Sequence, residues 1–185
     1  MALTSTRLTA EEYFALPPTE KRTQLIDGEI VVTEPSVRHQ RITGEIFAEV
    51  RSWLKAHPGH GEAGIPVDVY LDDRNVYAPD VWWVPEKRRP GRDDRRIVRP
   101  PALAVEVRSP STWRYDVGTK KTTYERLGLA ELWLVDTESD TVLVYRRSSP
   151  DAAVFDVALE LATGESLTTP LIPGFSLDLG ELFAR

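Results

Sequence analysis

Cysteine is absent from the 185 residues, so the chain cannot form a disulfide framework, a thiolate nucleophile or a cysteine-ligated zinc site. The first residues, MALTSTRLTAEE, also lack the apolar core of a signal peptide. No apolar run approaches the length that a membrane-spanning helix needs. We therefore expect a cytoplasmic protein that makes no contact with a membrane.

An excess of positive charge is missing as well. The formal net charge is −6, which argues against strong nonspecific binding to nucleic acid. The exception is the segment 86–99, where seven basic residues stand against three acidic ones, a local balance of +4. Two interpretations remain open: a loop in which residues such as Arg88, Arg89 and Arg92 contact phosphate, or a solvated loop that keeps the flanking apolar strands soluble.

The hydrophobic pattern predicts an α/β fold in which helices flank a mixed central β-sheet. Hydrophobic residues make up 41% of the chain and charged residues 28%, as in ordinary globular proteins. The length favours a single domain over residues 1–185. Helical spacing appears at 9–16, at 37–57 and around Lys120, and strands are predicted at 23–26, 29–33, 65–71, 80–84, 101–107, 131–136, 141–147 and 154–161.

Two acidic residues interrupt apolar runs: Asp80 in YAPDVWWV and Glu106 in ALAVEVRSPS. A buried carboxylate is costly unless its charge is compensated, and two neighbouring ones repel each other unless a cation lies between them. Side chains alternate along a strand, so Asp80 shares a face with Trp82, and Glu106 shares a face with Arg108. If the strands are neighbours, the two acids form a metal site; the alternative is a structural ion pair with a nearby cation.

Lys120 lies on the third of the predicted helices. At 100° per residue, Val117, Tyr124 and Leu127 form the apolar stripe of this helix, and Lys120 falls between the last two. Lys121 lies at the other margin of the stripe. We therefore expect Lys120 to point inward, toward the two acidic residues.

These residues resemble a known family. A Pro-Asp pair followed, 26 positions after its Asp, by Glu-X-X-Ser-Pro resembles the PD-(D/E)XK nuclease superfamily. The ordered series PDVWWV, EVRSPST and DVGTKKTTYERLGLAELWLVD, with LIDGEI before it and PGFSLDLGELF after it, is similar to the Uma family of restriction-endonuclease-like proteins. The resemblance covers most of the chain. It implies a restriction-endonuclease-like fold, hydrolysis of DNA with Mg²⁺ (or Mn²⁺ as a substitute), and a homodimer.

The resemblance also assigns roles to individual residues. It implies that Asp80 and Glu106 hold the metal, that the backbone carbonyl of Val107 adds a ligand, and that a lysine assists the attacking water. The superfamily places this lysine two residues after the glutamate, where the present sequence has Arg108. In the Uma family it comes from the following helix, and Lys120 matches it. Arg108 stays protonated, so it could contact phosphate but would be a poor base.

Three further positions bear on the site. Gln24 stands where the family usually has a glutamate, so the site has lost a negative charge if that glutamate helps to hold the metal. His39 either supports the site or only forms a hydrogen bond at a helix start. Trp82 either stacks on an unpaired base or belongs to the core. A nucleic-acid-binding module or scaffold without catalysis is therefore the alternative to a nuclease.

Overall fold

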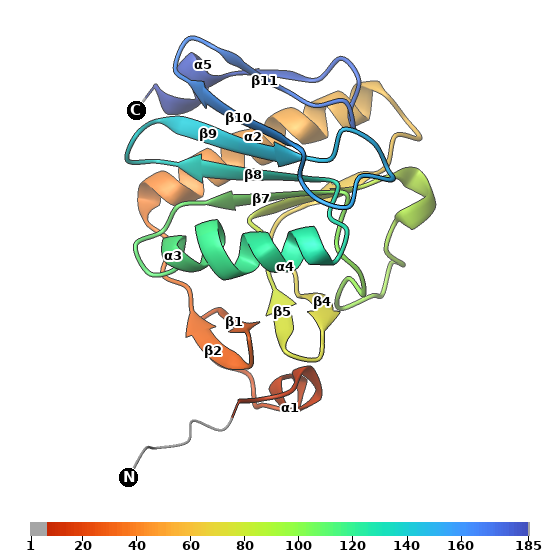
Figure 1. The fold of residues 1–185 in the computed structure, drawn as a ribbon, viewed down its shortest axis with the longest axis vertical. Coiled ribbons are helices and arrows are strands. Elements are labelled where there is room, and N and C mark those ends of the chain that lie inside the picture. The colour runs from red at the N-terminus through yellow and green to blue at the C-terminus, as the bar shows by residue number, and fades with distance from the viewer. Residues whose placement is uncertain (1–6, 185) are drawn as a thin grey trace.

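The computed structural model describes residues 7–184; residues 1–6, in which the sequence predicts no signal peptide, and residue 185 lie outside that range. At its centre is a six-stranded sheet in the order β10-β9-β8-β7-β6-β3 (Figure 1). The strands are β3 (Glu62–Gly64), β6 (Val81–Val84), β7 (Leu103–Val107), β8 (Glu131–Asp136), β9 (Thr141–Arg146) and β10 (Val157–Ala162). Strands β7 and β8 are parallel and the other pairs are antiparallel. The predicted α/β fold with a mixed central sheet is confirmed.

Helices cover both faces of this sheet (Figure 1). One face packs against α2 (Val37–Ala56) and α5 (Leu179–Phe183). The other face packs against a helix made of α3 (Trp113–Tyr115), η2 (Asp116–Lys120) and α4 (Lys121–Arg126). Strand alternation divides the core as expected, because odd-numbered residues of β6 and β7 face α2 and even-numbered residues face α4.

The helix that carries Lys120 is not a regular α-helix. Its central segment, η2, is a π-helical turn, and such a turn rotates the faces of the residues around it. Lys120 and Tyr124 are fully buried, as predicted. Val117, which was expected on the same apolar stripe, is 42% exposed. This prediction is wrong because uniform steps of 100° do not apply through a π-turn.

A second, four-stranded sheet lies beyond the edge of the first (Figure 1). Its strands, in spatial order, are β2 (Glu29–Val32), β1 (Thr23–Ile26), β5 (Asn75–Tyr77) and β4 (Val69–Asp72). The predicted hairpin of β1 and β2 is confirmed: Asp27 and Gly28 both have positive φ, as a two-residue hairpin turn requires. Helix α1 (Ala10–Phe14) begins with the predicted capping box of Thr9 and Glu12.

The predicted strand at 65–71 is wrong at its start. Strand β3 ends at Gly64 and β4 begins at Val69, so the residues between them belong to neither sheet. Pro66 has no N–H to donate to a strand ladder, and the Ile65 carbonyl instead accepts a hydrogen bond from Trp82 Nε1. This irregular segment forms one wall of the cavity described below.

Three short elements complete the fold: the 3₁₀ turn η1 (Glu86–Arg88) and the strands β11 (Ser166–Thr168) and β12 (Ser176–Asp178). The two strands pair with each other as a separate antiparallel ladder. Among residues 7–184, no helix combines the length and apolar character needed to span a membrane.

Candidate functional site

Asp80 lies directly before β6, beside the end of β7. Its backbone N–H donates to the carbonyl of Val105 (2.9 Å), which ties it to the neighbouring strand. Its carboxylate oxygen Oδ2 accepts hydrogen bonds from Val107 N (2.8 Å) and His39 Nε2 (3.1 Å). The side chain is 16% exposed, and no residue in the described range donates to Oδ1. Oδ1 is therefore available to a ligand.

Glu106 lies in β7, on the face that packs against α4. It is 3% exposed, and both of its carboxylate oxygens have partners. Oε1 accepts a hydrogen bond from Tyr124 Oη (2.9 Å), and Oε2 lies 2.6 Å from Lys120 Nζ. Burial raises the pKa of Glu106 to about 8; the charge of Lys120 opposes this shift, and the carboxylates of Asp116 and Asp80 add to it.

Lys120 is the cation of the site and is fully buried. Its Nζ contacts a second carboxylate, with Asp116 Oδ1 at 2.9 Å, and lies 5.5 Å from the centre of the Tyr77 ring. Burial alone would lower the pKa of Lys120, but the carboxylates of Asp116 and Glu106 outweigh that effect and raise it. Lys120 therefore stays protonated.

Asp116 was not predicted as a site residue. It is 1% exposed and lies four residues before Lys120, at the start of the π-turn. Its second oxygen, Oδ2, accepts a hydrogen bond from Thr112 Oγ1 (3.1 Å). Burial raises the pKa of Asp116, and Lys120 opposes the shift. The spacing of four residues between an acid and a lysine on one helix was the signal that could have identified it.

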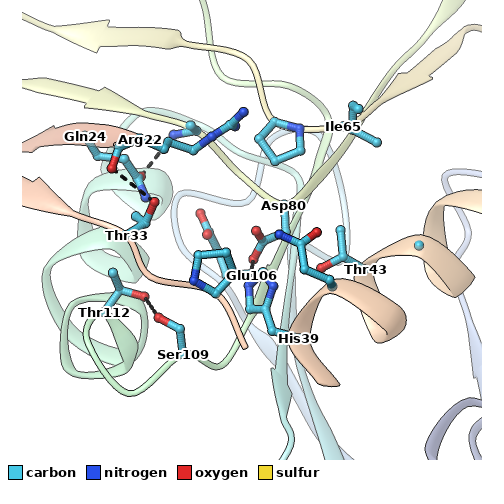
Figure 2. A pocket seen from close by; sticks show the side chains of 15 residues that line it. Arg22, Gln24, Thr33, His39, Thr43, Ile65, Asp80, Glu106, Ser109 and Thr112 are labelled. Atoms are coloured by element: carbon cyan, nitrogen blue, oxygen red, sulfur yellow. Dashed lines mark hydrogen bonds and ion pairs between the residues drawn. The ribbon is translucent and has the colours of Figure 1, made fainter. Parts of the chain in front are cut away.

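A cavity of about 260 Å³ lies in front of Asp80 and Glu106 (Figure 2). Asp80 and Glu106 are both directed into it, and His39 lies beside them. The opposite wall carries Gln24 and Arg22 from the β1–β2 hairpin. Other polar residues that line the cavity are Gln40, Thr33, Thr43, Ser109 and Thr112. The two acidic residues that the sequence singled out therefore face one common space.

The chain is similar to known proteins in sequence and in structure. Residues 10–180 match the model of the Uma2 family, described as "putative restriction endonuclease". The chain belongs to the Uma2 family. The predicted resemblance is therefore confirmed, and the protein belongs to a family of restriction-endonuclease-like nucleases.

A solved structure shows the same fold. It is the crystal structure of "a putative nuclease" from Anabaena variabilis, with a TM-score of 0.82 and 21% sequence identity. The match covers 96% of this chain and 98% of that one. A search of curated proteins finds no match.

The donor atoms of this Uma2 chain fit a hard divalent cation. Within the described range, no three histidine or carboxylate side chains form a ready-made metal site. Mg²⁺ does not need one, because proteins often hold it through one or two carboxylates while water and substrate phosphate complete its shell. Asp80 supplies a free oxygen. The carboxylates of Asp80, Glu106 and Asp116 outnumber the single ammonium group of Lys120, and this excess of negative charge favours binding of a cation.

Gln24 has a defined orientation in the cavity wall. It is 4% exposed, and its Oε1 accepts a hydrogen bond from the backbone N–H of Ala78 (3.0 Å). The amide nitrogen, which can only donate, is therefore the other polar end of this side chain. A glutamate could accept the same hydrogen bond and would add a second oxygen that can bind metal.

We expect Gln24→Glu to strengthen metal binding and to destabilise the metal-free protein. The new carboxylate joins Asp80 and Glu106 on the same cavity, so it attracts a cation and repels its neighbours. Manganese affinity measured by calorimetry should rise about tenfold, equivalent to roughly 1.4 kcal/mol, and the melting temperature without metal should fall. Unchanged affinity would mean that position 24 lies outside the reach of the ion.

His39 lies at the start of α2, with its backbone N–H donating to Ser36 Oγ (3.1 Å). Both interpretations of this residue therefore have structural support, since its ring also contacts Asp80. Burial lowers the pKa of His39, but the hydrogen bond and charge of Asp80 outweigh it, and the net shift is upward. The ring nitrogen Nδ1 is buried and has no hydrogen-bond partner in the described part of the chain. His39 thus fixes the Asp80 carboxylate from one side.

Arg108 does not line the cavity. Its guanidinium contacts the carboxylates of Asp136 (2.9 Å) and Glu138 (2.6 Å) and lies 5.3 Å from the centre of the Trp113 ring. These partners hold the side chain at the ends of β7 and β8. The structure therefore does not place the Arg108 guanidinium beside Asp80 and Glu106.

The predicted substrate-binding residues lie outside this cavity as well. Trp82 is buried, donates to the Ile65 carbonyl (2.8 Å) and lines a different cavity together with Arg89 and Arg92. Arg89 forms ion pairs with Glu62 and Glu86, and Arg88 bonds to the Pro100 carbonyl. Arg89 is therefore paired with carboxylates of the loop and of β3. Arg22, which the sequence reasoning missed, is the arginine that lines the cavity of Asp80.

Proposed function

We propose that this Uma2 protein is a Mg²⁺-dependent endonuclease that hydrolyses phosphodiester bonds of DNA. One observation carries the proposal: the Asp80 and Glu106 carboxylates, from the ends of two adjacent strands, face one cavity. Membership of a nuclease family supports the choice of reaction. Carboxylate pairs of this kind suit Mg²⁺, with Mn²⁺ as a substitute.

In this proposal Asp80 Oδ1 and Glu106 hold the ion, and the backbone carbonyl of Val107 adds a ligand. The Val107 N–H donates to Asp80, which places this part of the backbone against the site. A bound divalent ion would supply positive charge at the phosphate and make a water molecule more nucleophilic. His39 keeps Asp80 oriented through its hydrogen bond to Oδ2.

Lys120 has a narrower role than the sequence predicted. Its raised pKa keeps it protonated, so it donates hydrogen bonds and stabilises negative charge rather than taking a proton from water. The side chain is fully buried beside Glu106 and does not itself line the cavity. We therefore assign Lys120 to stabilising negative charge at the site from behind Glu106, without direct contact to the phosphate.

Arg22 is the best candidate for binding substrate phosphate. It is exposed on the cavity wall, its carbonyl is fixed by Thr33 N (3.0 Å), and it forms no ion pair with any residue from 7 to 184. We expect Arg22→Ala to weaken DNA binding and to lower the salt dependence of the binding constant by about one unit of log–log slope.

Fluorescence anisotropy of labelled DNA at several salt concentrations, without divalent metal, measures both effects. Arg92→Ala is the matched control, because it removes an exposed arginine of the basic loop that does not line the cavity of Asp80. A larger loss in Arg92→Ala than in Arg22→Ala would assign phosphate binding to the basic loop.

Incubation of duplex and single-stranded DNA with the protein tests the proposed function directly. We expect internal cuts with Mg²⁺ or Mn²⁺, no cutting with EDTA, and loss of cutting in Glu106→Gln. Glu131→Gln is the matched control, since it replaces a buried carboxylate on the neighbouring strand β8 that lies outside the cavity. Cleavage that survives EDTA, or equal cleavage by both variants, would contradict the proposal.

Gln24 favours a second candidate, a nucleic-acid-binding module of the same fold without catalysis. With an amide in place of the family's usual carboxylate, the cavity holds only the two acids Asp80 and Glu106. This candidate predicts DNA binding that responds to Arg22→Ala but no cleavage with any divalent metal. Cleavage gained in Gln24→Glu would show that the amide silences the site.

A further inference from the structure

Glu106 has no carboxylate oxygen without a partner. Tyr124 donates to Oε1 (2.9 Å) and Lys120 Nζ lies 2.6 Å from Oε2. Asp80 differs, because both bonds to its carboxylate converge on Oδ2 and leave Oδ1 open. The two proposed metal ligands are therefore in different states: one is ready to bind a cation, and the other already binds the ammonium group of Lys120.

We propose that Lys120 is a built-in cation that competes with a divalent metal for Glu106, and that Asp116 is the positioning residue that retains Lys120 when a metal takes its place. This inference rests on the proposed function only in assuming that Glu106 is a metal ligand. It adds a role for Asp116 and a switch between two cations at one carboxylate.

Asp116 is suited to retain the lysine. Its Oδ1 already lies 2.9 Å from Lys120 Nζ, and its Oδ2 is fixed by Thr112 Oγ1 (3.1 Å), which in turn contacts Ser109 Oγ (2.8 Å). The face of the Tyr77 ring adds a second favourable contact for the ammonium group. A lysine that gives up Glu106 would thus remain paired inside the core, where an unpaired charge is costly.

Lys120 is reached by two carboxylates from different elements. Asp116 and Lys120 are the first and last residues of η2, and both side chains are buried beneath the helix. Glu106 approaches from β7 on the opposite side. Lys120 therefore lies between a carboxylate of its own helix and a carboxylate of the sheet, and only the second of these lines the cavity.

Two substitutions separate the two roles. Lys120→Met removes the competing cation and keeps the apolar length of the side chain, so manganese affinity should rise at least about tenfold. Asp116→Asn keeps the shape but leaves the displaced lysine without a full negative partner, so manganese affinity should fall about tenfold. Calorimetric titration with MnCl₂ of wild type, both variants and the control Lys121→Met measures these changes. Lys121 is the adjacent lysine, and its Nζ lies over the Tyr145 ring rather than at the site.

Nuclear magnetic resonance of the lysine side-chain ¹⁵Nζ groups supplies a readout that simple loss of charge does not imitate. In the wild type, the Lys120 ammonium signal should shift when Mg²⁺ is added and should remain visible, because Asp116 still shields it. In Asp116→Asn, the same addition should broaden the signal through exchange with water. A Lys120 signal that does not respond to Mg²⁺ in the wild type would contradict the proposed replacement of Lys120 by the metal at Glu106.

The outcomes distinguish this inference from the proposed function. Equal manganese affinity in wild type and Lys120→Met overturns the competition but leaves Glu106 as a metal ligand. Absence of binding in every protein, Lys120→Met included, overturns both. If circular dichroism shows that Lys120→Met is unfolded, the test rests on Asp116→Asn. Manganese affinity equal to wild type in Asp116→Asn would reject the positioning role of Asp116.

Discussion

Replacing Lys120 by methionine will lower the free energy of unfolding by about 3–5 kcal/mol at pH 9. The substitution leaves the carboxylates of Glu106 and Asp116 buried without their shared cation. Breaking a buried ion pair from one side is strongly destabilising because the remaining charge has neither water nor a partner. Here two carboxylates lose the same partner at once.

The loss of unfolding free energy should depend on pH, and the pKa values of the two buried carboxyl groups determine whether it grows or shrinks as the pH rises. Burial raises the pKa of Glu106 to about 8 and also raises that of Asp116, so the folded state holds protons that the unfolded chain releases. A raised pKa contributes stability that is fully present below the ordinary value, 4.5 for Glu106 and 3.8 for Asp116, and is lost as the pH rises through the folded value. Without Lys120 both pKa values rise further, so the variant keeps protons that the wild type releases once the pH passes the wild-type value of about 8 for Glu106. The variant should therefore be more impaired at pH 9 than at pH 5.

Urea unfolding of wild type and Lys120→Met at pH 5 and pH 9 measures this difference. Lys121→Met is the control, because that lysine lies over the Tyr145 ring and its removal leaves both buried carboxylates paired. A loss of equal size at both pH values would mean that Lys120 stabilises the fold by packing and not by charge.

The sequence was sufficient for the parts of the site that depend on local rules. Alternation along a strand placed Glu106 on the face of Ala104, and the structure agrees, since Ala104 packs beside Tyr124 and Glu106 contacts Lys120 and Tyr124. The helical projection separately placed Lys120 inward, and it is fully buried. The strand prediction succeeded because the direction of a side chain from a strand is fixed by its parity, whatever the rest of the chain does.

The rest depends on long-range packing that no local pattern contains. The π-turn at η2 turned Val117 outward, whereas a uniform helical step places it on the apolar stripe. The charge of the basic loop was visible in the sequence, but its engagement by Glu62 and Glu86 was not. Arg22 had no motif to mark it, and it reaches the cavity only because the hairpin of the second sheet folds over the first.

Replacing Asp80 by asparagine should reduce DNA cleavage at least about a hundredfold, equivalent to roughly 2.7 kcal/mol in the barrier. Asparagine is nearly isosteric, and its single carbonyl oxygen can still accept the Val107 N–H that Oδ2 accepts now. The amide nitrogen would then occupy the position of Oδ1 and present a donor where a cation needs an oxygen. The fold should survive while the charge and the free ligand atom are lost.

This combination makes Asp80→Asn the sharpest test of the site. Initial rates of plasmid and oligonucleotide cleavage with Mg²⁺ and Mn²⁺ give the loss, and thermal unfolding shows whether the fold persists. Asp68→Asn is a suitable control, because Asp68 is a partly buried carboxylate that does not line the cavity. Cleavage within a few-fold of wild type in Asp80→Asn would remove this carboxylate from the mechanism. A stable variant that neither cuts DNA nor binds manganese would show that the Asp80 carboxylate is required both for metal binding and for cleavage.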